Sequence, residues 1–337
     1  MKKSDAWLLA LLGLVLLILP FLATGYVLYI VNLLMVYVVL ALGLHIVLGE
    51  TGQFALSHIA FYGIGIYTSG LLNNAFGLNA LWLLAASTLT CGIFGFLLGT
   101  LAIRMRDIYL ALSTFAFGEA MQWVFLNWES VTNGSNGYRL SPIRFFGHVM
   151  ATDAQAYPFV VVMTALVLAF TVHLSRSRLG SSFRAVRESD VAAQAVGINV
   201  NLVKRVAFMF SAAYAGLAGA LYTTFSSFIH PESLGFQAMI LVLIMVVVGG
   251  IGSVRGAITG AIIFGLISEL LRQLLSFQEV IYGLVLILFM MFMPKGLLGN
   301  GRPLRLKRAT RAPDIPGQAP VEEGNTVGVG ARRSEQA

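Results

Sequence analysis

The sequence contains few charged residues. Asp, Glu, Lys and Arg together make up 11% of the 337 residues, whereas an average soluble domain contains about 25%. Hydrophobic residues account for 58%, and the mean hydropathy is +0.83. Because a soluble fold cannot hide that much apolar surface, the composition predicts an integral membrane protein whose charges gather between and after the apolar runs.

Motifs typical of several other protein classes are missing. The single cysteine, Cys91, excludes an intramolecular disulfide and a multi-cysteine metal site. No lysine follows a glycine, so the chain lacks a GxxxxGK[ST] phosphate loop and does not bind ATP by that route. The histidines lack HxxxH and HExxH spacing, no GxSxG motif occurs, and no basic cluster is interleaved with aromatic residues. We therefore expect no bound metal or cofactor, no enzymatic activity and no nucleic-acid partner.

The apolar residues form runs that are long enough to cross a bilayer, which takes about 20 residues of helix. Lipid offers no partner to unpaired backbone groups, so each crossing must be helical. The predicted fold class is an all-α integral membrane protein, a polytopic bundle of about 10 transmembrane helices, with about 8 as the lower bound. The runs are residues 7–24, 26–48, 54–72, 80–103, 108–128, 156–174, 206–229, 238–254, 257–275 and 279–293. The first run also has the pattern of a secretory signal peptide, but the later runs favour a retained helix.

Basic residues indicate the orientation. If Lys2 and Lys3 are cytoplasmic, alternate crossings place the other basic segments on the same side, as the positive-inside rule requires. These segments are Arg104 and Arg106, the loop 175–205, Arg255 and the chain from Lys295. Both termini are then cytoplasmic. We expect residues 1–293 to form the transmembrane domain, and residues 294–337 to form a disordered cytoplasmic tail, rich in Gly, Pro and charge, whose basic first half lies on anionic membrane lipid.

The cytoplasmic loop at residues 175–199 is predicted to contain a short helix. Ser189 or Asp190 is a suitable N-cap and Gly197 a suitable stop. Small side chains at Ala192, Ala193 and Val196 then share one face. A helix of so few turns is marginally stable alone, so we expect a partner to hold it in a groove. The nearby Arg184 and Arg187 are expected to meet acidic rims or lipid phosphates; the alternative is a solvated loop that only obeys the positive-inside rule.

Two glycine-rich joints interrupt the apolar pattern. The first contains Gly49 and Gly52, and the second contains Gly249, Gly250 and Gly252. Each joint is expected to be either a cytoplasmic turn or a re-entrant break that faces a cavity. Polar residues follow the first joint and are candidates to line a translocation path, namely Gln53, Ser57 and His58.

Glu119 lies near the middle of the run 108–128. A carboxylate there costs about 2.5–3.5 kcal/mol on insertion scales, so something must offset the cost. One interpretation is a pathway or gating residue that acts with Thr114 and Gln122. The other is a protonated or paired carboxyl group with a structural role.

Four long segments, taken together, resemble a known family. They are residues 49–72 (GETGQFALSHIAFYGIGIYTSGLL), 108–137, 183–199 (FRAVRESDVAAQAVGIN) and 213–261. In this order they are similar to the M-type permease subunits of bacterial ABC importers for branched-chain amino acids. The resemblance covers roughly residues 30–300.

The resemblance implies a role for the cytoplasmic loop and a set of partners. In such importers a short helix of a loop similar in role to the EAA loop docks in a cleft of the ATPase subunit, and here that coupling loop would include Arg184, Arg187, Glu188, Ala192, Ala193 and Gly197. The implied partners are a homologous second permease, two ATPase subunits that bind ATP and Mg²⁺, and a periplasmic binding protein. The outer loop 129–155 is a candidate docking surface for the binding protein.

The expected function is import of branched-chain amino acids across a bacterial inner membrane. Two alternatives remain open from the sequence. One is an importer of urea or short-chain amides, since close relatives share these motifs. The other is an ion- or proton-coupled carrier with Glu119 as its coupling residue.

Overall fold

The computed structural model describes residues 24–271 except 106 and 146, and seven further positions, 281, 283, 284, 287, 291, 296 and 297. The predicted run 7–24 lies outside this part, and so do most of the run 279–293 and most of the tail. Each of the other predicted runs coincides with a helix, so the helical fold class is confirmed where the chain is described.

The long helices cross the described part in alternating directions. They are α2 (Gly25–Leu44), continued by the π-helix η1 (His45–Glu50), α3 (His58–Phe76), α4 (Ala80–Ala102), α5 (Asp107–Asn127), α7 (Asp153–Arg176), α10 (Val200–Tyr222), α11 (Phe236–Gly250) and α12 (Val254–Leu271). By length and composition, 4 spans are apolar enough to cross a membrane: Gly25–Glu50, α4, α7 and α12. The chain is therefore a helical membrane protein, and the predicted count of ten crossings is not reached among the described helices.

Three helix boundaries differ from the prediction. The run 54–72 begins late, because residues 51–57 have no regular structure and α3 starts at His58. The helix α10 is displaced toward the N-terminus because the side chain of Asn199 accepts a hydrogen bond from Leu202 N and caps it. At 15 residues, α11 is about 22 Å long, which is shorter than the ~30 Å hydrocarbon core.

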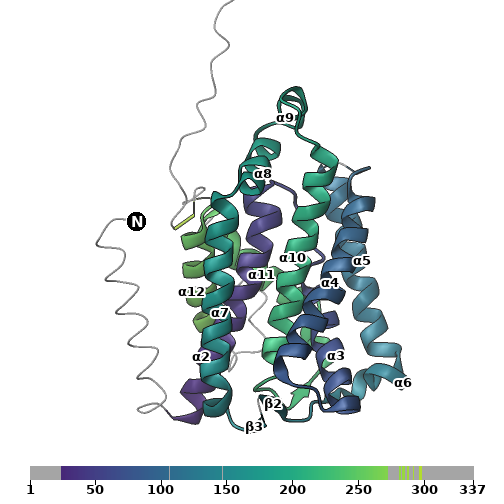
Figure 1. Ribbon diagram of the computed structural model, residues 1–337, viewed down its shortest axis with the longest axis vertical. Coiled ribbons are helices and arrows are strands. Elements are labelled where there is room, and N and C mark those ends of the chain that lie inside the picture. Colours follow the sequence, from purple (N-terminus) through teal and green to yellow (C-terminus); the bar gives the residue numbers. More distant parts are fainter. Residues whose placement is uncertain are drawn as a thin grey trace, which may run out of the picture. The chain divides into compact units, whose positions relative to one another are not determined.

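Short elements join the helices at the end opposite the helix α9 (Asp190–Ala195) (Figure 1). Strands β1 (Tyr138–Arg139) and β4 (Phe228–Ile229) pair antiparallel, with Tyr138 opposite Ile229. Strands β2 (Ile143–Phe145) and β3 (His148–Met150) also pair antiparallel, with Arg144 opposite Val149. The helices α6 (Glu129–Thr132), η2 (Gly134–Asn136) and η3 (Pro231–Leu234) complete this end.

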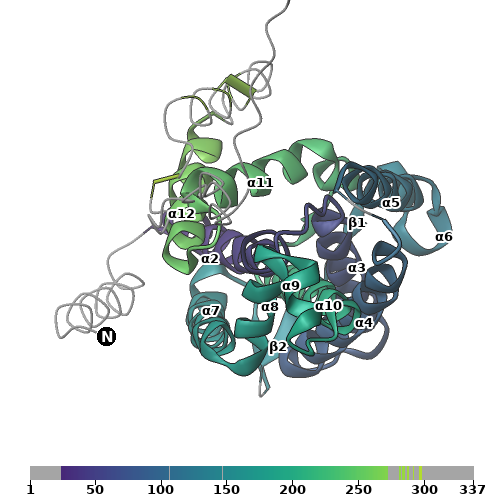
Figure 2. The same ribbon diagram turned by 90° about the horizontal axis from the view of Figure 1, so that it is seen from above.

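Helices α2 and α10 form the centre of the bundle. In Figure 2, α2 lies among α7, α10, α11 and α12, and it packs against all four. Helix α10 also packs against α3 and α4, where small residues let the backbones approach closely. A Cβ atom at Gly65 of α3 would lie 2.5 Å from the carbonyl oxygen of Gly216, so this crossing has no space for a side chain.

The Gly65→Ala substitution is expected to destabilise the bundle by about 1–3 kcal/mol, because it forces α3 away from the α10 backbone. Gly92→Ala is the matched control, since the added Cβ would sit 3.6 Å from Ala213 Cβ, an ordinary contact. Thermal unfolding of the two purified variants in detergent measures the difference. Equal melting temperatures would contradict the close α3–α10 crossing.

Candidate functional site

The loop at residues 175–199 folds as two short helices, α8 (Arg178–Glu188) and α9. Ser177 caps α8 by accepting a hydrogen bond from Gly180 N, and Phe183 and Val186 bury the apolar side of that helix. Ser189 caps α9 in the same way through Ala192 N. Gly197 follows with φ +83°, a conformation that favours glycine. The predicted short helix and its two boundary signals are therefore confirmed.

The exposed face of α9 differs from the predicted one. Ala193 was expected on the outer face, but it is 2% exposed and packs within the chain. Val191 and Val196 are 77% and 75% exposed, and Ala192 between them is exposed too. The outward apolar face thus includes Val191, Ala192 and Val196, and Ala195 is exposed beside them. The sequence missed Val191 because so short a helix does not fix which side meets the bundle.

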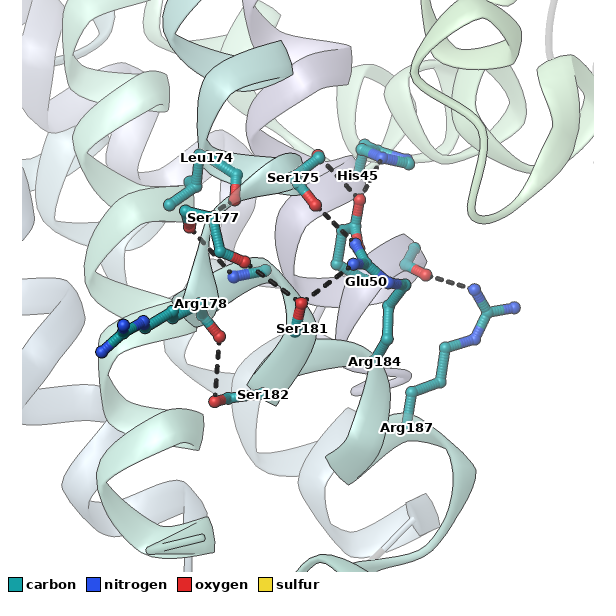
Figure 3. A network of polar contacts seen from close by, with 12 residues as sticks. His45, Glu50, Leu174, Ser175, Ser177, Arg178, Ser181, Ser182, Arg184 and Arg187 are labelled. Carbon is teal, nitrogen blue, oxygen red and sulfur yellow. Dashed lines mark hydrogen bonds and ion pairs between the residues drawn. The ribbon is translucent and has the colours of Figure 1, made fainter.

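Arg184 and Arg187 both contact the first glycine joint of the same chain. Figure 3 shows both side chains turned toward the end of the π-helix η1. Arg184 Nη1 lies 3.2 Å from Glu50 Oε2 and donates to Ser175 O at 2.7 Å. Arg187 Nη1 donates to the carbonyl oxygen of Gly49. Both residues remain exposed, the Arg184 side chain at 48%, and so does Glu188, so the expectation that the two arginines meet acidic rims or lipid phosphates stays a prediction.

Glu50 is the buried centre of this network. It is 6% exposed, and a buried carboxylate must be paired and hydrogen-bonded. Ser175 Oγ donates to Glu50 Oε1 at 2.8 Å, and Nε2 of the fully buried His45 lies 3.6 Å from the same oxygen. With Arg184 on the other oxygen, partners from η1, α7 and α8 meet at one carboxyl group. The position of Glu50 at the end of an apolar run was the sequence signal for it.

The two glycine joints lie against each other, although about 200 residues separate them in the sequence. A Cβ atom at Gly49 would lie 3.2 Å from Gly252 N. A Cβ atom at Gly52 would lie 3.1 Å from Arg187 Cγ, and one at Gly252 would overlap Arg187 Nη1. Both Gly52 and Gly252 have positive φ, at +71° and +85°. The side chain of Arg187 therefore lies between the two joints and contacts both.

The joints have different structures. The first is the π-helical turn followed by the irregular residues 51–57, most of which are buried. The second is a tight turn between α11 and α12, in which Ser253 N donates to Gly250 O at 3.2 Å and Gly249 packs against Gly256 of α12. Turns of π-helix and breaks of this kind are common where a helix kinks and at functional sites.

Four of the predicted pathway residues are buried in or beside the first joint. Gln53 Nε2 donates to Thr51 Oγ1 at 2.9 Å, and Leu56 N donates to Thr114 Oγ1 at 2.9 Å. The ring nitrogens of His58 lie 3.1 Å from Ser211 Oγ and 2.9 Å from Leu40 O. Ser57 is 2% exposed. In this structure the side chains of Gln53, His58 and Thr114 make hydrogen bonds in or beside the irregular segment, and Ser57 is buried in it.

Glu119 and Gln122 are placed differently. Both line a narrow cleft of about 10 Å³ between α3, α5 and α11, which has room for about one water molecule. Gln122 packs directly against Gly235, where a Cβ atom would overlap its amide nitrogen. Glu119 is exposed on α5. A carboxylate facing lipid at this depth is costly, so this face of α5 requires protein or water beside it.

Comparison with known proteins agrees with the membrane fold. The family described as "branched-chain amino acid transport system / permease component" matches residues 26–293. The permease protein LivM of the Escherichia coli K12 high-affinity branched-chain amino acid transport system is 34% identical over 313 residues, which are 86% of this chain and 74% of LivM. LivH, a permease protein of the high-affinity branched-chain amino acid transport system of Salmonella typhimurium, is 31% identical over 284 residues, which are 78% of this chain and 91% of LivH. No solved structure matches the chain.

Proposed function

Because the chain belongs to the branched-chain amino acid transport permease family, we propose that it is the M-type permease subunit of an ATP-driven importer for leucine, isoleucine and valine. It is a multi-pass membrane protein, which we place in a bacterial inner membrane. The two spans at residues 7–24 and 279–293 would bring the crossings to about ten and leave both termini cytoplasmic.

One observation carries the proposed mechanism: Arg187 contacts both glycine joints. Arg187 lies near the end of α8, directly before the exposed helix α9. Its side chain donates a hydrogen bond to Gly49 of the first joint and lies against Gly252 of the second. A pull on α9 would therefore reach the ends of α2 and α11 together. We propose that closure of the ATPase subunits moves α8 and α9, and that α2, α3, α11 and α12 then swing about the joints to alternate access.

The proposed partners fit separate surfaces of the chain. The apolar face of α9 (Val191, Ala192 and Val196) would dock in a groove of an ATPase subunit, and two such subunits would bind ATP and Mg²⁺, for which this chain has no phosphate loop. A homologous second permease would cover the Glu119 side of α5. This is consistent with the similarity of the chain to both LivM and LivH. A periplasmic binding protein would dock on the end formed by α6, η2 and β1–β3.

The proposed function predicts ATP-dependent uptake of leucine. The chain would be purified with its second permease and ATPase subunits, reconstituted in liposomes, and supplied with ATP and the binding protein. Uptake of radiolabelled leucine is expected to require all of these components. A complex that transports leucine without ATP, or the single chain alone importing it with ATP, would contradict the proposal.

The same assay separates the two alternatives. Uptake of urea in place of leucine would indicate an importer of small amides. Uptake driven by a proton gradient without ATPase subunits, and lost in Glu119→Gln, would indicate a coupled carrier. No contact of Glu119 or Gln122 in the described residues favours either alternative over the importer.

A further inference from the structure

A polar cavity of about 320 Å³ lies between α2, α3, α10, α11 and α12; it includes no residue of the glycine joints and shares Ile59 with the Glu119 cleft. Ile229 of β4 and Glu232 and Ser233 of η3 line one part of it. These elements lie at the end of the bundle opposite α9 (Figure 1), so the cavity belongs to the half that would face the periplasm. Its volume is at the lower end of the range of small-molecule sites, about 300–1,000 Å³.

Aromatic rings dominate the polar wall of this cavity. Tyr29 and Tyr37 come from α2, Tyr62 from α3 and Tyr222 from α10. The rings of Tyr62 and Tyr222 have centroids 6.1 Å apart and an interplanar angle of 64°, so they present an edge and a face to the space around them. The faces of such rings attract an ammonium group, most strongly where water is excluded.

Negative charge and apolar surface complete the wall. Glu232 and Glu269 both line the cavity, and Glu269 accepts a hydrogen bond from Tyr26 at 2.9 Å. Leu33, Ile59 and Leu241 supply compact apolar surface. Among the described lining residues there is no lysine or arginine, whereas serine and glutamine side chains supply neutral hydrogen-bond donors.

This combination indicates the class of ligand. A compact apolar side chain of the ligand fits against the lining residues Leu33, Ile59 and Leu241. An ammonium group of the ligand fits the faces of the tyrosine rings and the carboxylates of the wall. The carboxylate of the same ligand would accept hydrogen bonds only from the neutral serine and glutamine donors. A ligand with a second carboxylate, such as glutamate, is therefore disfavoured. Urea has neither the cation nor the apolar group.

We propose that this cavity is a binding site for a zwitterionic amino acid with a small apolar side chain, on the outer half of the translocation path. The proposal rests on the proposed function and deepens it, because it assigns solute selection to this chain as well as to a binding protein. It also moves the expected pathway contacts from Gln53 and His58 to the tyrosines of α2, α3 and α10.

Cysteine labelling tests occupancy directly. Ala238 lines the cavity and is half-buried, whereas the native Cys91 is fully buried, so Ala238→Cys introduces one accessible thiol with little background. The intact complex in membranes would be labelled with a small water-soluble thiol reagent. Leucine is expected to slow labelling of Ala238→Cys, and urea and glutamate are expected not to.

Variants of Tyr62 then test the aromatic wall in the Ala238→Cys background. Tyr62→Leu removes the ring, and the leucine concentration for half-protection is expected to rise about tenfold. Tyr62→Phe keeps the ring and should stay within about twofold. Tyr67→Leu is the matched control, since Tyr67 is buried on the same helix, stacks on Phe125 and does not line the cavity.

Each outcome decides something different. Absence of leucine protection in a complex that imports leucine would overturn the cavity proposal and leave the proposed function intact. Protection that is equal in Tyr62→Leu and in the parent would also overturn it. A complex that neither imports leucine nor shows protection would overturn both proposals together.

Discussion

Arg187→Ala is expected to lower ATP-driven leucine uptake by at least about tenfold while the complex still assembles and hydrolyses ATP. The reason is that the substitution removes the hydrogen bond from α8 to Gly49 and the contact with Gly252. A hydrogen bond from a charged donor contributes about 1.5–3 kcal/mol, which corresponds to roughly 10- to 100-fold in an equilibrium. The ratio of leucine imported to ATP hydrolysed, measured in liposomes, reports the loss of coupling.

Two further variants make this result specific. Arg178→Ala is the matched control, because Arg178 lies on the same helix, is exposed, and points away from the network in Figure 3. It should leave the transport ratio unchanged. Gly252→Ala should reproduce the defect, since its Cβ would displace the Arg187 guanidinium. If Arg187→Ala kept the wild-type ratio, α8 would not transmit movement through this residue.

Ala192→Arg is expected to abolish copurification of the ATPase subunits and to leave the second permease bound. Ala192 lies on the exposed apolar face of α9, where a long cation would prevent close approach to a groove. Stable association depends on a few well-packed contacts at the centre of an interface, so one wedge there is costly. Affinity purification from native membranes, followed by quantification of each subunit, measures the effect.

The orientation of α9 supplies the controls for this experiment. Gln194→Arg changes an exposed polar residue of the same helix that lies about 160° around the helix axis from Ala192, and it should retain the ATPase subunits. Ala193→Arg would place the charge in a site that is 2% exposed, so it should lower the yield of folded protein instead. Equal ATPase recovery with Ala192→Arg and with Gln194→Arg would exclude this face as the docking surface.

The helices were predictable because their signals are local. Runs of apolar residues give the spans, and a capping residue such as Ser189 gives a helix boundary through a hydrogen bond to a nearby amide. The turn pair Asn133-Gly134 likewise adopts positive φ at both residues. Boundaries failed where distant contacts decide them, as at residues 51–57, where Leu56 N bonds to Thr114 of another helix.

The segments of the candidate site could be predicted from the sequence, but the contacts between them could not. The sequence singled out the basic loop, the two glycine joints and the carboxylate at residue 119, each from its own neighbourhood. It placed Arg184 and Arg187 outward, because positive charges near a membrane usually face water or phosphate. Packing buries Glu50 and brings it within 3.2 Å of Arg184 Nη1, so this contact inside the chain could not be predicted from the sequence.

The sequence by itself therefore determined the class of protein, the helical crossings and the short helix α9 with small side chains on one face, since hydrophobicity, capping and charge act over a few residues. Only the tertiary structure decided that two joints meet at Arg187, that Ala193 faces inward and that four tyrosines from three helices line one cavity. The physical reason is that these contacts join residues far apart in the chain, and their geometry is fixed by how helices pack.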